Sequence, residues 1–303
     1  MANLVNLEAV THGFGTRILL DGVSLGLGAG EVIGVVGRNG DGKTTLLRIL
    51  TGDLEPDDGR VTVAGNASIG VLAQDTIGDD AETVRDWIVG GEPDHVWAAD
   101  ASQRAVVEAL LADVDLDRAL GTLSGGERRR VGLVGVLLGH HDLVVLDEPT
   151  NHLDVEAIAF LAEYLRARTR AGLAMLVVSH DRWFLDEVCT RIWEVHDGVV
   201  DAYDGGYAAY VLAKVERQRQ AAANEARRKN LARKELAWLR RGAPARTSKP
   251  RFRIDAANVL IADEPPPRDT VALQQFAVTR LGKDVFDLTS VDYAVPGRTL
   301  LDR

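Results

Sequence analysis

A glycine-rich loop, GRNGDGKTT from Gly37 to Thr45, constrains the fold more than any other stretch of this sequence. A short apolar run, EVIGVVG, leads into it, and an apolar helical pattern, TTLLRILTG, follows it up to Gly52. The loop matches the pattern G-x-x-x-x-G-K-[ST], in which backbone N–H groups close around phosphate oxygens at a helix N-terminus. The sequence therefore predicts a buried strand, a phosphate-binding loop and a helix, in that order.

The loop also assigns roles to individual side chains. Lys43 is expected to reach the β and γ phosphates, and the Thr44 hydroxyl is expected to bind Mg²⁺. Asp41 is an unusual acidic neighbour for a phosphate, and we expect its side chain to point outward. The residues expected to contact the phosphates are Gly37, Asn39, Gly40, Gly42, Lys43, Thr44 and Thr45.

Short apolar strands alternate with helical patterns over about the first 210 residues. Two more buried strands are LVVLD, from Leu143 to Asp147, and AMLVVS, from Ala174 to Ser179. Each ends in polar residues, as strands do at the active-site edge of a parallel sheet. Residues 3–27 and 59–72 are instead typical of antiparallel strands with turns. The predicted fold class is α/β, a P-loop NTPase with a mostly parallel sheet.

The strand that ends at Asp147 supplies a second part of the site. Asp147 is expected to hold Mg²⁺, directly or through water, and Glu148 follows it at once. A carboxylate one residue beyond the metal ligand can take a proton from an attacking water or position that water. The alternative, that Asp-Glu-Pro only caps a turn, is disfavoured by the phosphate loop upstream.

A third stretch, LSGGE from Leu123 to Glu127, resembles the signature motif of the ABC ATPases. The other positions that match the family, in its order, are Phe14, Gln74 in VLAQD, Asp154 in NHLD and His180 in VVSHD. The resemblance implies an ATP-hydrolysing cassette over residues 1–210, with an antiparallel β subdomain and a helical subdomain. ATP and Mg²⁺ are the cofactors that it implies.

The resemblance also implies roles for these residues. Ser124, Gly125 and Gly126 would contact the γ-phosphate that an opposite cassette binds. Phe14 would stack on adenine, and Asp154 would belong to the nucleotide-contacting loop after the catalytic strand. Gln74 would contact the metal ion and act in catalysis, and His180 would be the catalytic switch histidine.

Further residues resemble the ABC-F family, ATPases with two cassettes that act on ribosomes. The matching stretches are EPTNHLD from Glu148 to Asp154, SHDRWFLDEV, and YDGGYAAYVLAKVERQRQ. Fewer than fifty residues separate Gln74 from Leu123. This is too short for the large helical arm that some members carry, so an arm-less member is expected.

A basic segment follows the cassette and is predicted to form a helical hairpin over residues 211–267. Between Lys214 and Arg253 the chain has fourteen basic and three acidic residues, which leaves the rest of the chain at −21. The resemblance implies contact with the ribosome or tRNA, through Arg240, Arg241, Arg246, Lys249, Arg251 and Arg253. A basic cluster suits any polyanion, and a solvated coiled coil is the alternative for a charge-rich helix.

The C-terminal residues are similar to the N-terminal ones. At an offset of 281, Leu4–Asp21 aligns with Val285–Asp302, with six identities in eighteen positions. Residues 283–303 are therefore expected to be the truncated start of a second ABC cassette. The composite site of the family needs a second cassette, in cis in a longer protein or from another copy of this chain. Weak or concentration-dependent ATPase activity is expected as a result.

The amino-acid composition limits the cellular compartments and the classes of protein that are expected. The single cysteine, Cys189, cannot form an internal disulfide, and no apolar run reaches the roughly 18 residues of a membrane span. A cytoplasmic protein without a membrane segment is expected. A DNA-directed repair ATPase would share the basic segment, whereas the ATPase subunit of a transporter would have no use for it. Both remain alternatives to a role in translation.

Overall fold

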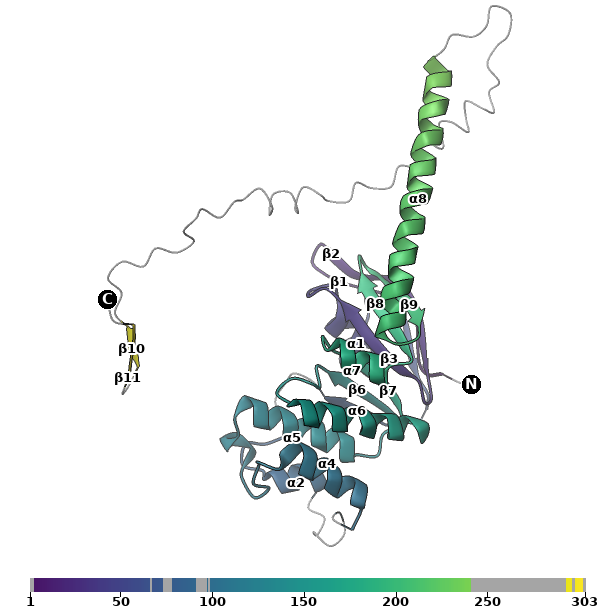
Figure 1. The fold of residues 1–303 in the computed structure, drawn as a ribbon. Coiled ribbons are helices and arrows are strands. Elements are labelled where there is room, and N and C mark those ends of the chain that lie inside the picture. The colour runs from purple at the N-terminus through teal and green to yellow at the C-terminus, as the bar shows by residue number, and fades with distance from the viewer. Residues whose placement is uncertain are drawn as a thin grey trace, which may run out of the picture. The chain divides into compact units, whose positions relative to one another are not determined.

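The structure is a computed structural model that describes residues 3–65, 67–72, 78–90, 97, 99–240, 293–295 and 298–301. The chain divides into two compact units, Met1–Arg219 and Gln220–Arg303. The first unit contains the phosphate-binding loop and the catalytic strands, and its elements are labelled in Figure 1.

A six-stranded sheet runs through the first unit in the order β5-β6-β7-β3-β8-β9. Its strands are β5 Ile69–Leu72, β6 Leu143–Asp147, β7 Ala174–Val178, β3 Val32–Gly37, β8 Arg191–His196 and β9 Val199–Asp204. The first five are parallel, and β9 pairs antiparallel with β8. The predicted α/β class with a mostly parallel sheet is confirmed.

A separate antiparallel sheet has the order β2-β1-β4. Its strands are β1 Asn3–Phe14, β2 Arg17–Gly28 and β4 Asp58–Val63. The predicted antiparallel strands are confirmed here, but the prediction was wrong for β5, which pairs parallel with β6. β5 alternates in burial because it lies at a sheet edge, and such alternation is also typical of antiparallel strands.

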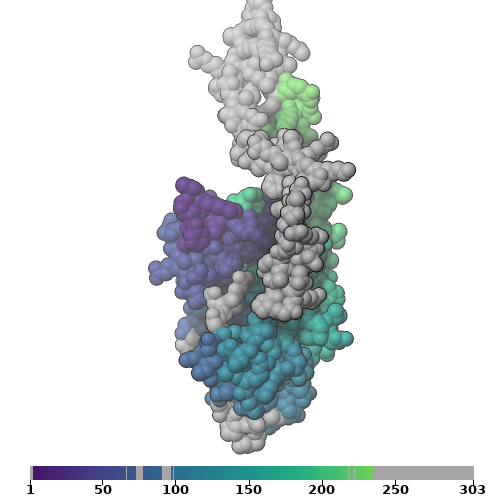
Figure 2. All heavy atoms as spheres, turned by 90° about the vertical axis from the view of Figure 1, so that its left-hand side faces the viewer, coloured from purple at the N-terminus to yellow at the C-terminus, as the bar shows by residue number. Residues whose placement is uncertain are grey.

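The described α-helices are, in chain order, α1 Lys43–Thr51, α2 Val84–Val89, α4 Ala101–Leu111, α5 Gly125–Leu138, α6 Val155–Arg170, α7 Arg182–Val188 and α8 Tyr207–Arg240. Helices α2 and α4 pack on α5 and form the predicted helical subdomain, away from β1 and β2 (Figure 1). In Figure 2 the first strands are purple, and the helices of the helical subdomain are blue to teal and lie below them.

Two apolar cores lie on opposite faces of the large sheet. On β6, Val144 and Leu146 join the core shared with the helical subdomain. Leu143 and Val145 join the core that contains the antiparallel sheet and the buried face of α1. Successive side chains of a strand point to opposite faces, so continuous apolar strands bury both. This leaves the polar strand ends as the chemically active edge.

The second unit contains the end of α8 and a short antiparallel hairpin, β10 Tyr293–Val295 and β11 Arg298–Leu301. In β1 and β2 the hairpin tip pairs Phe14 with Arg17, Gly13 with Ile18 and His12 with Leu20. In β10 and β11 the pairs are Val295 with Arg298, Ala294 with Thr299 and Tyr293 with Leu301. The register and its irregularity therefore repeat at the offset of 281.

Three predictions fall partly or wholly outside the described residues. These are the loop and second helix of the basic hairpin, the boundaries of the second cassette, and the position of Gln74. The long helix before the basic loop is described as α8, which starts at Tyr207. The domain boundaries 1–210, 211–267 and 283–303 stay predictions.

Candidate nucleotide-binding site

The loop between β3 and α1 has a backbone that only glycine tolerates at several positions. A Cβ atom on Gly37 would lie 2.4 Å from the carbonyl oxygen of Val195. Gly40 and Gly42 have φ angles of 84° and 102°, in the left-handed region that L side chains rarely adopt. Gly42 is also the N-cap of α1, so the glycines turn the chain directly from the strand into the helix.

Lys43 folds back across this loop. Its Nζ donates hydrogen bonds to the carbonyl oxygens of Gly37 at 2.9 Å and Arg38 at 3.0 Å. An ammonium group has three N–H donors, so two can hold the loop while the third points to a phosphate oxygen. The phosphate-binding role of Lys43 stays a prediction.

Asp41 differs from the expectation of an outward side chain. Its Oδ2 accepts a hydrogen bond from the backbone N–H of Arg38 at 3.1 Å, and Oδ1 lies 3.8 Å from a guanidinium nitrogen of Arg17. The carboxylate therefore turns onto the loop itself. It occupies an N–H group of the loop and puts a negative charge close to the phosphate position.

Asp147 ends β6 and is buried, with 6% of its surface exposed. Burial raises the pKa of its carboxyl above the usual value, and the neighbouring Glu148 raises it further. The charges of Arg129, Lys43 and His180 act in the opposite direction. Two neighbouring buried carboxyl groups favour the binding of a cation, which would lie between these groups and a phosphate.

The residues present fit a Mg²⁺ ion held together with a nucleotide. Mg²⁺ takes oxygen ligands and usually combines one or two protein oxygens with phosphates and waters. Thr44, in the first turn of α1, and Asp147 provide such oxygens. Among the described residues no group of three or more His, Cys, Asp or Glu could hold a metal ion alone.

Glu148 and His180 come together at the ends of β6 and β7. Glu148 Oε1 lies 3.4 Å from His180 Nε2, and Oε2 accepts the backbone N–H of His180 at 3.3 Å. Glu148 is 8% exposed, whereas 67% of the His180 side chain is exposed. The carboxylate is thus fixed in a partly dry position while the imidazole stays open to a ligand.

Phe14 lies at the tip of β1 and is 59% exposed. Its ring packs against the edge of the buried His12 ring, with centroids 5.1 Å apart and planes at 87°. An exposed ring supported from one side has a free face for stacking on a base. The adenine-stacking role of Phe14 stays a prediction.

Ser124 caps α5 through a capping box. Its Oγ accepts the Glu127 N–H at 3.3 Å, and a Glu127 carboxylate oxygen accepts the Ser124 N–H at 2.7 Å. These hydrogen bonds and the Arg118 guanidinium lower the pKa of Glu127 to about 2. Ser124 and Gly125 are exposed, so this helix N-terminus is open to a ligand from another molecule.

Asp154 also serves as a helix cap, since its carboxylate accepts the N–H of Ala157 at 2.8 Å at the start of α6.

The predicted nucleic-acid residues are mostly outside the described part of the chain. Arg240 ends α8, and Arg241, Arg246, Lys249, Arg251 and Arg253 lie beyond it.

Arg129 was not predicted from the sequence. Its Nη2 donates hydrogen bonds to the carbonyl oxygens of Asp147 at 2.5 Å and Glu148 at 3.4 Å. The only signal in the sequence is its place in ERRR, directly after the two glycines of the signature stretch. A run of arginines usually indicates a solvent-exposed helix face, so the sequence does not reveal that one of these side chains points into the protein.

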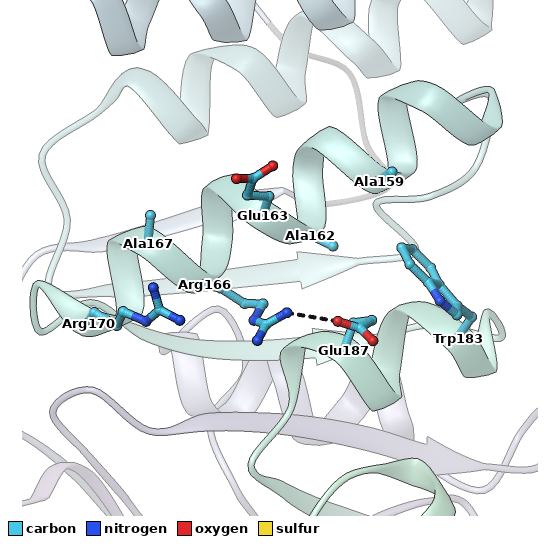
Figure 3. A pocket seen from close by; sticks show the side chains of 8 residues that line it. All are labelled: Ala159, Ala162, Glu163, Arg166, Ala167, Arg170, Trp183 and Glu187. Carbon is cyan, nitrogen blue, oxygen red and sulfur yellow. Dashed lines mark hydrogen bonds and ion pairs between the residues drawn. The ribbon is translucent and has the colours of Figure 1, made fainter.

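A groove between α6 and α7 is separate from these residues (Figure 3). Its floor is formed by small side chains of α6, and the exposed Trp183 forms one end. Arg166 and Glu187 form an ion pair at 2.8 Å across it. None of the predicted nucleotide-binding residues lines this groove.

Two family models match the chain, over residues 20–151 and 193–272, and both carry the description ABC transporter. The chain belongs to the ABC family of ATPases. ABC ATPase domains bind ATP, typically with Mg²⁺, and their shared chemistry is ATP hydrolysis. None of the described helices of this ABC protein is both long and apolar enough to cross a membrane.

Curated relatives match the ABC protein along most of its chain. The uncharacterized ABC transporter ATP-binding protein YfmR of Bacillus subtilis is 33% identical, over 99% of this chain and 53% of its own length. The energy-dependent translational throttle protein EttA of Escherichia coli K12 is also 33% identical, over 94% of this chain and 58% of its own length. These relatives confirm the resemblance to the ABC-F family. The chain spans little more than half the length of each.

Solved structures confirm the ABC cassette fold. A structure of the ATP binding subunit of an ABC transporter matches with a TM-score of 0.61 and 19% identity, over 72% of this chain and 93% of its own. A chain in the complex of archaeal ribosomal stalk protein and archaeal ribosome recycling factor matches with a TM-score of 0.57 and 30% identity. The match covers 66% of this chain and 39% of the chain in the complex.

Proposed function

We propose that this chain binds ATP with Mg²⁺ at the loop from Gly37 to Thr45 and hydrolyses it. The observation that carries the proposal is the pairing of the buried Glu148 with the exposed His180, beside Asp147. Lys43 holds the β and γ phosphates, and Thr44 and Asp147 hold the Mg²⁺ ion, which neutralises charge on the phosphate oxygens.

In the proposed reaction Glu148 orients a water and accepts its proton as the water oxygen attacks the γ-phosphorus. The bond from phosphorus to the ADP oxygen breaks, and ADP leaves with its electron pair. His180 donates a hydrogen bond to the γ-phosphate and so connects this phosphate to the end of β7. Gln74 belongs to the same proposed set.

The site is proposed to be composite, with Ser124, Gly125 and Gly126 of one cassette completing the nucleotide site of another. The exposed N-terminus of α5 supports this, since no phosphate-binding residue of the same cassette contacts it in the described hydrogen bonds. We therefore expect this chain to hydrolyse ATP weakly, at a specific rate that rises with protein concentration.

We further propose that the protein acts on the ribosome. Support comes from the relatives named as translational throttle proteins, and from the net charge of +11 between Lys214 and Arg253. Basic residues in such density bind nucleic acid with strong salt dependence. A DNA-directed role rests on the same charge, and the family description supports a transporter role.

Sedimentation of this chain with ribosomes tests the target. With Glu148→Gln and ATP, we expect binding that falls at least about tenfold between 50 and 200 mM salt. Excess tRNA should compete better than duplex DNA of equal charge. Duplex DNA that competes better would favour the DNA-directed role, and absence of binding at low salt would contradict both nucleic-acid roles.

A further inference from the structure

The catalytic strand is followed by a peptide in an unusual conformation. Glu148 has a φ angle of 51°, in the left-handed region that residues other than glycine rarely adopt. Its N–H donates to the carbonyl oxygen of Val178 at 2.7 Å, which ties the peptide to β7 on one side. A second tie is needed to fix the direction in which the side chain leaves the backbone.

Arg129 provides that second tie. Its Nη2 bonds to the carbonyl oxygens of Asp147 and Glu148, at 2.5 and 3.4 Å. With the N–H and C=O groups of Glu148 both held, its carboxylate is aimed at His180. Guanidinium has a planar, rigid set of donors, which suits two adjacent carbonyl oxygens better than the single ammonium of a lysine does.

The same helix also contacts the segment after Glu148. A Cβ atom on Gly126 would lie 3.4 Å from the His152 ring, and His152 has a φ angle of 65°. Ser124 is the N-cap of this helix. The exposed helix N-terminus and the catalytic carboxylate are therefore joined by one short rigid element, α5.

We infer that Arg129 is a positioning residue, which holds the backbone of Asp147 and Glu148 so that the Glu148 carboxylate is directed toward the attacking water. The inference rests on the proposed catalytic role of Glu148. It adds to the hydrolytic site a residue of α5, the helix whose N-cap is Ser124.

The test is a double-mutant cycle on this chain, with ATP turnover and ATP affinity measured separately. Arg129→Gln should lower kcat by between about ten- and a hundred-fold, with KM within about two-fold of the wild type. Because Arg129 acts through Glu148, Arg129→Gln should slow the Glu148→Gln variant no further. Arg129→Lys keeps the charge but not the planar donors, and should recover only part of kcat.

Arg130→Gln is the matched control, since it removes the same charge from the same helix. Arg130 bonds bidentately to Asp113 at 2.7 and 2.8 Å, away from β6. Its kcat should stay within about two-fold of the wild type. Circular dichroism and Tm show which variants fold, and Arg129→Lys replaces Arg129→Gln in the cycle if the latter does not.

Three outcomes contradict these claims at different levels. A kcat for Arg129→Gln equal to that of Arg130→Gln overturns the inference alone. Additive losses in the double variant also overturn it, because a residue that acts by general destabilisation would add to Glu148→Gln. Wild-type turnover by Glu148→Gln overturns the proposed function as well as the inference.

Discussion

At the scale of single residues, the loop from Gly37 to Thr45 contains one side chain, Asp41, whose negative charge disfavours the binding of phosphate. The Asp41 carboxylate accepts the Arg38 N–H and lies beside Arg17, so it competes with a phosphate for a donor of the loop. The same hydrogen bond restrains the backbone of the loop at Arg38. Affinity for ATP is therefore set by a balance between charge repulsion and preorganisation.

The balance predicts that Asp41→Asn binds ATP more tightly. The amide oxygen can still accept from Arg38, whereas the negative charge is removed. Two like charges at about 4 Å in high dielectric repel by about 1 kcal/mol, so Kd should fall about five-fold. Isothermal titration with ATP measures it. Asp53→Asn, beyond the other end of α1, is the control, and an equal or weaker affinity of Asp41→Asn would contradict the argument.

At the scale of elements, α5 is held at its start by the capping box of Ser124 and Glu127. The pKa of Glu127 is lowered from 4.5 in a free side chain to about 2 in the folded chain. A lowered carboxyl pKa means that the ionised form stabilises the fold. This contribution is complete above about pH 4.5 and is lost as the pH falls through about 2.

Glu127→Gln should therefore flatten the acid branch of the stability curve. A glutamine can keep the capping box but not the ion pair with Arg118. The variant should have a lower Tm than the wild type at about pH 6 and a nearly equal one at about pH 2. Thermal melts across this range measure it, with the exposed Glu108→Gln on α4 as the control. Parallel curves for wild type and variant would show that the carboxylate contributes nothing.

The start of α8 is anchored by a buried charge. Glu194 on β8 is 7% exposed, accepts a hydrogen bond from the Tyr203 hydroxyl at 3.2 Å and pairs with Lys214 of α8. Lys214 also donates to the Tyr210 hydroxyl at 3.0 Å. A buried carboxylate that loses its cation is destabilising, because its desolvation is no longer offset.

Lys214→Met should lower the free energy of unfolding by about 1–2 kcal/mol, less than for a fully buried pair because Lys214 is partly exposed. Urea denaturation measures the difference. Arg219→Met, an exposed change on the same helix, should cost less than about 0.5 kcal/mol. Equal losses in the two variants would show that Glu194 does not need its partner.

Elements with a contiguous signal were predictable from the sequence. Within a few consecutive residues the sequence contains the whole pattern that predicts each of β3, β6, β7 and the loop before α1. Arg129 was not predictable, because its contact depends on how α5 lies against β6. Arg128, Arg129 and Arg130 are consecutive but about 100° apart around the helix, so they reach Asp80, Asp147 and Asp113 respectively. The orientation of Asp41 depends on backbone angles that no pattern encodes.

At the scale of the whole molecule, the proposed composite site assigns the phosphate loop and the α5 N-terminus of one cassette to two different sites. This predicts complementation between two inactive variants. Lys43→Ala removes phosphate binding, and Ser124→Arg blocks the helix N-terminus. In a random mixture half of the pairs are mixed and each has one intact site, so turnover should recover to about a quarter of the wild type.

Phosphate release at several mixing ratios measures this recovery, and a mixture of Lys43→Ala with Lys43→Arg is the control. No recovery, in a mixture shown to associate, would contradict the composite site. Activity of Ser124→Arg by itself would mean that each cassette hydrolyses ATP without the helix N-terminus of another.

The repeated hairpin has a consequence of its own. Val295 is the last residue of β10, as Phe14 is of β1, and the two have the same pairing on the neighbouring strand. Valine has no aromatic ring, and in the sequence the aromatic residue before it is Tyr293, two residues earlier. The two hairpins share a strand register and differ in sequence at this position, so the stacking role predicted for Phe14 has no aromatic counterpart at Val295.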